Sequence, residues 1–333
     1  VDIISGCPPI YVIPSIDHPL FADFRDADNW LDPREAVIAL ETGGEAKAYP
    51  LQVLMFHEIV NDVIGAVPVA VTFCPLCNAS IVFDRRVQGT VLDFGTTGRL
   101  RKSDLVMYDR QAESWWQQFT GTGIVGEHAG VRLVQIPSQV VAYADFKAAH
   151  PAGRVLSRDT GHTRPYGRNP YRGYDQVGQN PFLFHDPVDT RLPAMERVLG
   201  VSIGGRHRVY PFSALDSRPV INDVFLERPI VVFTKVGMLS PLDEEKITAS
   251  RAIPAAVAFS RELGGKVLHF ELRDGRIRDR ETGSEWNTFG RAVAGALKGR
   301  QLARLQGGVH FAFAWLSFVP DSEIYRPQSA ATR

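Results

Sequence analysis

Two cysteines separated by two residues are the first candidates for chemistry in this sequence. Cys74 and Cys77 occur in the segment FCPLCN, residues 73–78. On a tight turn, two such thiolates can bind the same metal ion. They can also form a reversible disulfide. Residues 79–83 have the composition of a strand, so we do not expect the helix N-terminus that activates the thiol of thioredoxin-like proteins. Both a metal site and a redox pair remain open.

A histidine upstream of the pair is the nearest further ligand. His57 lies in the apolar stretch 51–60, which is predicted to form a short buried helix before the strand that leads to the cysteines. If helix and turn flank the same strand end, His57, Cys74 and Cys77 converge on a Cys2His site with one open position. Such a site suits zinc, or copper if the thioether of Met107 contributes. The alternative is a hydrogen-bonded core histidine.

The middle of the chain is rich in arginine, tyrosine, proline and glycine. Residues 156–196 follow neither a helical nor a strand periodicity, and a loop of this length in a compact protein is usually functional or disordered. The aromatic content argues against disorder, so we expect an ordered wrap over one face. Arg164, Tyr166 and Tyr174 of this wrap are the candidate catalytic residues, which would orient a small polar substrate above the metal.

The sequence repeats itself on either side of the wrap. Tyr49 recurs as Tyr210, and Asp62 recurs as Asp223; the offset is 161 in both cases, the difference between 210 and 49 and between 223 and 62. Residues present in both copies are expected to be structural. A second set recurs at an offset of 170, namely Asp109 with Asp279, Arg110 with Arg280, and Trp116 with Trp286.

These repeats predict an α+β protein with two duplicated, mainly antiparallel β-rich halves related by a pseudo-twofold axis. At the offset of 161, Lys235 and Met238 replace Cys74 and Cys77, so the second copy lacks the metal ligands. We expect Asp109 and Arg110 to form an ion pair. The predicted organisation is an N-terminal extension (1–34), repeat 1 with the Cys/His site (35–155), the connecting wrap (156–196) and repeat 2 without the site (197–326).

Composition excludes several classes of protein. The 333 residues carry 37 basic and 37 acidic side chains, and without a basic excess we expect no nucleic-acid partner. No apolar run reaches the roughly 18–20 residues of a transmembrane helix. Three cysteines are too few for a disulfide scaffold, and Cys7, alone in a Gly/Pro-rich stretch, receives no role. The neutral charge leaves the oligomeric state open.

Several long motifs together resemble a known family. They are HEIVND (57–62), VTFCPLCNA (71–79), DLVMYDR (104–110), YGRNPYRGYD (166–175) and FAWLSFVP (313–320). The sequence resembles the prokaryotic family called domain of unknown function 3179. Its members often carry export or lipoprotein signals, which implies a periplasmic or extracellular location. The first residue, Val1, suggests a removed leader or a trimmed terminus. In an exported protein the cysteine pair is liable to oxidation unless a metal holds it reduced.

The leading hypothesis is a metalloprotein, and more specifically an enzyme with a copper or zinc ion that acts on a small molecule. Copper would suit oxidation with dioxygen, and zinc would suit hydrolysis. One alternative is a thiol–disulfide protein in which Cys74 is the attacking thiol. Another is a non-catalytic extracellular metal carrier or binding module.

Overall fold

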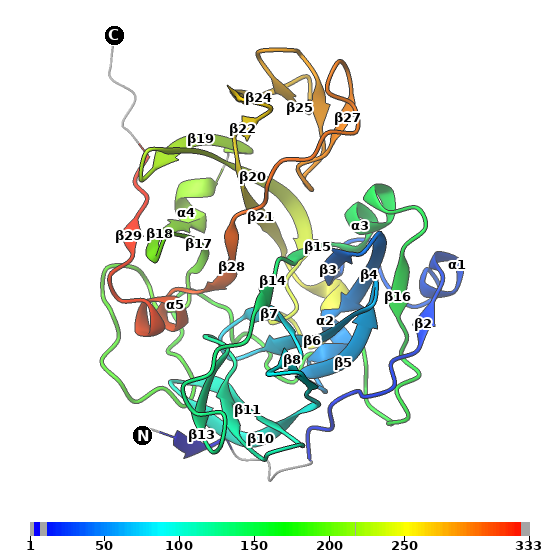
Figure 1. The fold of residues 1–333 in the computed structure, drawn as a ribbon, viewed down its shortest axis with the longest axis vertical. Helices are drawn as coiled ribbons and strands as arrows, with labels where there is room; N and C mark the ends of the chain where they lie inside the picture. The colour runs from blue at the N-terminus through cyan, green and yellow to red at the C-terminus, as the bar shows by residue number, and fades with distance from the viewer. Residues whose placement is uncertain (1–2, 7–11, 217, 328–333) are drawn as a thin grey trace.

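The computed structural model describes residues 3–6, 12–216 and 218–327, so Cys7 lies outside the described residues. Strands make up 45% of the chain and helices 9%, which confirms the expected β-rich architecture (Figure 1). The helices are shorter than an α+β fold suggests, and the longest two, in the described residues, span seven residues each. None of the helices in the described part is long and apolar enough to cross a bilayer.

The first half of the chain forms three main sheets, with strand orders β15-β3-β4-β16-β2, β14-β7-β6-β5 and β1-β10-β11-β12-β13. Its elements are β1 (Ile3–Ser5), β2 (Phe21–Ala22), α1 (Phe24–Ala27), β3 (Ala36–Thr42), β4 (Glu45–Pro50), α2 (Leu51–Leu54), β5 (Ile59–Ile64), β6 (Val67–Cys74), β7 (Ala79–Asp84), β8 (Arg86–Val87), β9 (Thr90–Val91), β10 (Phe94–Arg101), β11 (Asp104–Asp109), β12 (Trp115–Gln117), β13 (Thr122–Val125), β14 (Gln135–Ile136), β15 (Gln139–Ala142), α3 (Tyr143–Ala149) and β16 (Arg154–Leu156).

The second half forms sheets of similar order, β28-β17-β18-β29, β19-β20-β21 and β24-β25-β26-β27. Its elements are β17 (Arg197–Ile203), β18 (Arg206–Pro211), α4 (Phe212–Leu215), β19 (Val220–Phe225), β20 (Arg228–Leu239), the 3-10 helix η1 (Ile247–Ala249), β21 (Ala252–Ser260), β22 (Glu262–Leu263), β23 (Lys266–Val267), β24 (Phe270–Arg273), β25 (Arg276–Asp279), β26 (Glu285–Trp286), β27 (Ala292–Ala294), β28 (Gln306–Phe311), α5 (Ala312–Phe318) and β29 (Glu323–Ile324).

The two halves share details of strand pairing. β16 lies parallel to β4, and β29 lies parallel to β18, whereas the neighbouring hairpins are antiparallel. The Tyr49 hydroxyl donates to Asp62 at 2.7 Å, and the Tyr210 hydroxyl donates to Asp223 at the same distance. In each half, a buried tyrosine on the second strand of a hairpin is therefore hydrogen-bonded to an aspartate on the first strand of the next sheet.

The helix predicted for residues 51–60 is wrong beyond its first turn. α2 ends at Leu54, and residues 59–64 form strand β5. Asn61, a residue type that is common in turns, here donates through Nδ2 to the Phe94 carbonyl at 2.8 Å and accepts from the Phe94 N–H at 3.0 Å. These two hydrogen bonds between the Asn61 side-chain amide and the Phe94 backbone stabilise asparagine inside a strand. Tertiary contacts thus override its local preference for turns.

A buried tryptophan and an aspartate form the same unit in both halves. The Trp116 indole N–H donates to Asp109 at 2.8 Å, and the Trp286 indole N–H donates to Asp279 at 2.8 Å. The ion pair expected between Asp109 and Arg110 is absent among the described residues, because Arg110 instead lies 2.9 Å from Asp17. Asp109 therefore accepts hydrogen bonds from the Trp116 indole and from the N–H of Ala112 in the following turn, and it does not pair with Arg110.

We expect Asp279→Ala to lower the free energy of unfolding, because it leaves the Trp286 indole and the Thr282 N–H without their acceptor. Each buried donor that loses its partner costs about 1–3 kcal/mol. Urea denaturation measures the effect. Glu271→Ala is the control, since it removes only the more exposed ion pair with Arg280 and should cost at most about 1 kcal/mol. An unchanged midpoint for Asp279→Ala would contradict the structural role.

The halves meet around α5 and β28. The main hydrophobic core contains residues of the first half together with Phe313 and Trp315 of α5. The Phe311 N–H, at the end of β28, donates to the Cys77 carbonyl at 3.0 Å. The first half thus completes its core with β28 and α5, a segment from near the C-terminus that lies beside β7 (Figure 1).

Candidate metal centre

The cysteine pair lies on the tight turn between β6 and β7. Cys74 is the last residue of β6 and pairs with Ala79, the first residue of β7. Asn78 closes the turn in the left-handed region, at φ 49°, a conformation that asparagine tolerates better than most residues. Cys74 and Cys77 are 1% and 0% exposed and both thiols are free. The strand that follows confirms that no helix begins at this pair.

A neighbouring hairpin brings a backbone carbonyl and a carboxylate to the two sulfurs. β10 and β11 are joined by Lys102 and Ser103, at φ 54° and 63°. Two consecutive positive φ values are costly for residues other than glycine, asparagine or aspartate. The Lys102 ammonium donates to the Ser317 carbonyl at 2.8 Å and helps to hold this turn. Cys74 and Cys77 point their sulfurs at the Ser103 carbonyl, at 3.8 and 3.4 Å.

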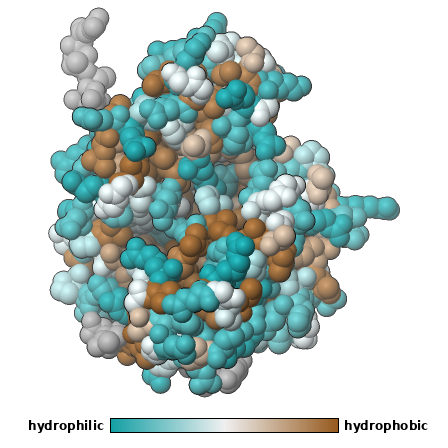
Figure 2. Space-filling view, in the orientation of Figure 1, coloured by the Kyte–Doolittle hydropathy of each residue, from teal (hydrophilic) through white to brown (hydrophobic). Residues whose placement is uncertain are grey.

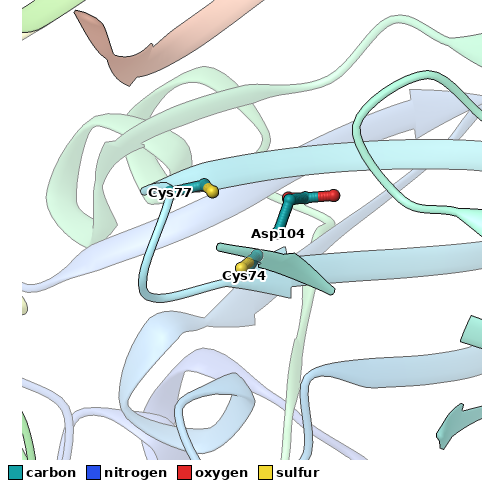
Figure 3. Close-up of side chains that lie close together, drawn as sticks. All are labelled: Cys74, Cys77 and Asp104. Atoms are coloured by element: carbon teal, nitrogen blue, oxygen red, sulfur yellow. The ribbon is translucent and has the colours of Figure 1, made fainter. Parts of the chain in front are cut away.

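Asp104, the first residue of β11, completes a group of three ligating side chains. One ligand atom each of Cys74, Cys77 and Asp104 lie within 4.8 Å of one another (Figure 3). Oδ2 of Asp104 accepts from Gln117 Nε2 at 2.6 Å and from the Phe119 N–H at 2.9 Å. Oδ1 is buried and has no N–H or O–H partner among the described residues; the thiols of Cys74 and Cys77 are its neighbours and hydrogen-bond this carboxyl. Because a thiol is a weak donor, a cation between this oxygen and the two sulfurs would satisfy the carboxylate better.

Burial and mutual repulsion disfavour negative charge at this place. Burial raises the pKa of Asp104 to about 7 and of the adjacent Glu58 to about 8, and the charge of Asp104 adds to the shift at Glu58. Burial also raises the pKa of both thiols. Glu58 itself sits in the left-handed region, at φ 58°. Four acidic groups therefore share a buried space, and burial is the largest cause of the shift of each pKa.

His57 lies outside this group and is engaged elsewhere. Nδ1 is 2.7 Å from the Pro14 carbonyl, which can only accept, so Nδ1 carries the proton. Nε2 consequently accepts from the Tyr166 hydroxyl at 2.6 Å. Burial lowers the pKa of His57 to about 4, so the ring is neutral. The structure thus places Asp104, rather than the predicted His57, beside the sulfurs.

Met107, the predicted soft ligand, is also outside the group. It lies on β11, fully buried in the main core, and its neighbours across the sheet are Thr96 and Trp116. Successive side chains of a strand point to opposite faces, so Met107 and Asp104, three positions apart, face opposite sides of β11. The thioether therefore does not join the sulfurs of the turn.

The wrap covers the cysteine turn through tyrosines. The Tyr174 hydroxyl donates to the Leu76 carbonyl at 3.0 Å and accepts from the Phe182 N–H at 3.1 Å. Burial raises the pKa of Tyr171, and the nearby Glu58 and Cys74 add to this shift. Both rings therefore lie against the acidic cluster, as a cover between the cluster and solvent.

The other two catalytic candidates lie apart from the sulfurs. Tyr166 contacts His57, and its hydroxyl is also 2.6 Å from Thr160 Oγ1. Arg164 donates to the Val12 carbonyl at 2.9 Å and so binds the N-terminal segment. Of the three predicted residues, only Tyr174 contacts the cysteine turn.

The wrap is anchored to the second half by a buried ion cluster. Asp175, whose side chain is 0% exposed, lies 2.7 Å from Arg197 and 2.8 Å from Arg251. The Ser240 hydroxyl also donates to this carboxylate. Because Asp175 directly follows Tyr174, the cluster fixes the end of the segment that covers the cysteines.

Sequence reasoning missed Asp104 and Glu58 as members of the site. No local sequence pattern marks Asp104, whose position depends on a hairpin that is longer in the first half: β10 and β11 span eight and six residues, whereas β24 and β25 span four each. The longer hairpin of the first half carries its first β11 residue, Asp104, to the sulfurs.

The comparisons with known proteins agree with the resemblance drawn from the motifs. Neither the curated proteins nor the solved structures contain a match to this chain. Residues 12–322 match the profile of the family described as "Protein of unknown function (DUF3179)". Since this match covers nearly the whole chain, the chain belongs to the DUF3179 family.

Proposed function

We propose that the protein binds one divalent metal ion through Cys74, Cys77 and Asp104. The observation that carries the proposal is the buried carboxylate of Asp104, whose Oδ1 has only thiols as neighbouring donors, beside two free sulfurs, with one ligand atom of each residue within 4.8 Å of the others. With Zn–S bonds of about 2.3 Å, a tetrahedral ion would hold two sulfurs about 3.8 Å apart, which requires little movement of the turn. Binding would also let the thiols and Asp104 ionise together, which burial alone opposes.

We propose zinc in preference to copper. Two thiolates and one carboxylate form a donor set typical of zinc, whereas copper(I) prefers thiolates and thioethers. Support comes from Asp104, a hard oxygen ligand, and from Met107, whose thioether faces the other side of β11. This ligand set replaces the predicted Cys2His set.

We further propose that the centre serves an enzyme acting on a small polar substrate. Three protein ligands leave a fourth position for another molecule, as in catalytic zinc sites. Glu58 lies near this position, and Tyr171 and Tyr174 cover it. The buried cluster gives solvent little access, so the wrap would have to open for substrate to enter.

A thiol–disulfide function is the second candidate, and the closeness of the two sulfurs favours it. Against it stands the raised pKa of both thiols, because the thiolate is the reactive species. A carrier that releases its ion readily is third, since burial under the wrap opposes exchange.

Titration of metal-free protein with Zn2+ tests the metal proposal, with calorimetry and elemental analysis as readouts. We expect one ion per chain, and loss of that ion in Asp104→Ala. His57→Gln and Met107→Leu are matched controls that should keep full binding. Binding that survives Asp104→Ala but fails in His57→Gln would overturn the proposed ligand set in favour of Cys2His. Absence of binding, together with a Cys74–Cys77 disulfide that forms reversibly, would favour the redox function.

We also propose that the two halves arose by internal duplication and are related by a pseudo-twofold axis. The repeated pairing of β16 with β4 and β29 with β18 supports this, as do the repeated Tyr–Asp and Trp–Asp hydrogen bonds. Export to the periplasm or the extracellular space, and the domain boundaries given above, remain predictions. In an exported protein, a bound metal would protect the pair from oxidation.

A further inference from the structure

A pocket of about 220 Å3 lies where the two halves meet, outside the cysteine cluster. The first half contributes Phe119 and Arg132, and the second half contributes His310, Trp315 and Phe318. Hydrophobic residues gather in the middle of the face on which α5 and β28 lie (Figure 2). Ligand sites are frequent at such junctions, and this volume suits a compound smaller than most drugs.

Aromatic rings form much of the wall of this pocket. Phe119 stacks on Phe318 with ring centroids 4.6 Å apart, and it lies 4.8 Å from the ring of His310. Trp315 lies 5.3 Å from His310 and 6.0 Å from Phe119, so the three rings pack against one another. Flat aromatic walls favour a planar ring, which can stack on them or meet them edge to face.

Two polar groups of the pocket lack partners among the described residues. His310 is 3% exposed, and its Nδ1 has no hydrogen bond. A buried donor or acceptor without a partner costs free energy that a ligand can recover. Burial lowers the pKa of His310 to about 3, so the ring is neutral. Arg132, an exposed residue that also lines this pocket, forms no ion pair with any described residue, so its positive charge is available to an anion.

A second pocket, of about 420 Å3, offers a contrast within the same molecule. There Phe289 lies 5.0 Å from His150, an aromatic–histidine contact like that of Phe119 and His310. However, Glu41 lies 3.9 Å from His150 and pairs with Arg291 at 2.9 Å. The second pocket therefore already holds a carboxylate that neutralises Arg291, while Arg304 also lines it.

We propose that the pocket at Phe119 and His310 binds a small planar aromatic carboxylate, about the size of benzoate. The ring would lie among Phe119, Trp315 and Phe318, the carboxylate would pair with Arg132, and His310 would bond a polar group of the ligand. This site goes beyond the proposed metal centre and does not depend on it. The two are nevertheless linked, because the Phe119 N–H binds Asp104.

Calorimetric titration of the full chain with benzoate tests this inference, and benzamide serves as the uncharged analogue. We expect benzoate to bind one site, with affinity lowered about tenfold or more by Arg132→Gln and for benzamide. His310→Phe, which fills the pocket, should abolish binding. His150→Phe, in the second pocket, should leave binding unchanged. Cys74→Ser should also bind benzoate normally, so a failure of the metal proposal is distinguishable from a failure here.

Two results would overturn the inference. One is the absence of saturable benzoate binding to the folded wild-type chain. The other is equal affinity for benzoate and benzamide together with no effect of Arg132→Gln. That result would show that the pocket binds the aromatic ring alone and does not recognise the carboxylate. Because Arg132 is exposed, its replacement leaves the core intact and remains informative if His310→Phe fails to fold.

Discussion

Replacing Cys74 with serine is expected to abolish stoichiometric zinc binding and the thermal stabilisation that zinc gives to the wild-type chain. An ion that binds only the folded state stabilises it by about 4 kcal/mol when its free concentration is a thousandfold above the dissociation constant. The metal-free variant should keep its fold, because the volume changes little and the turn is held by β6, β7 and Phe311. Thermal unfolding with zinc and with a chelator measures both effects.

The control for this prediction is Lys235→Ser, at the position of the second half that corresponds to Cys74. Lys235 is largely exposed and pairs with Asp145, so its replacement should leave the zinc-dependent shift in melting temperature intact. A zinc-dependent shift in Cys74→Ser as large as that of the wild type would contradict the assignment of Cys74 as a ligand.

Asp175→Asn is expected to destabilise the chain and to expose the cysteines. The change removes the counter-charge of Arg197, whose side chain is 6% exposed, and breaking a buried pair in this way costs about 3–5 kcal/mol. Because Asp175 also anchors the wrap beside Tyr174, its replacement should loosen the cover over Cys74 and Cys77. Thiol reagents should then react faster with the metal-free variant than with the metal-free wild-type protein. Chemical denaturation and the rate of thiol modification measure the two effects.

The stabilisation that the Asp175 carboxylate provides depends on pH, and the direction of this dependence follows from its pKa. Burial raises the pKa of Asp175, but Arg197, Ser240 and Arg251 outweigh burial, and the pKa of this carboxyl is lowered in the folded chain. The stabilisation is therefore present above the ordinary pKa of aspartate, about 4, and is lost as the pH falls through the lower folded value. The difference in stability between wild type and variant should shrink in acid.

Asp189→Asn is the matched control for Asp175→Asn. Asp189 also belongs to the wrap and also pairs with an arginine, Arg191 at 2.7 Å, but both side chains are partly exposed. Such a pair contributes at most about 1 kcal/mol, and its loss should leave thiol reactivity unchanged. Equal effects of the two substitutions would show that the ion cluster does not hold the cover in place.

Local patterns predicted the strands around the site but not all of its members. The β-branched run before Cys74 and the strand after Cys77 follow from alternation and composition, which act over a few residues. Asp104 could not be predicted as a ligand, because its approach to the sulfurs depends on the length and register of a separate hairpin. The nearness of His57 to the cysteines in sequence predicts a ligand, but Pro14 and Tyr166, from two other segments, bind its ring.

The hydrogen bond from Phe311 to Cys77 also bears on how the protein matures. The cysteine turn is made early in synthesis, whereas β28 and α5, which close its surroundings, are made among the last segments of the chain. Contacts between distant segments form late and slowly, so the thiols of an unfinished or truncated chain stay open to oxidants and to the wrong metal. If the centre binds a metal as proposed, its correct loading depends on complete synthesis, and chains cut before β28 would leave Cys74 and Cys77 unprotected.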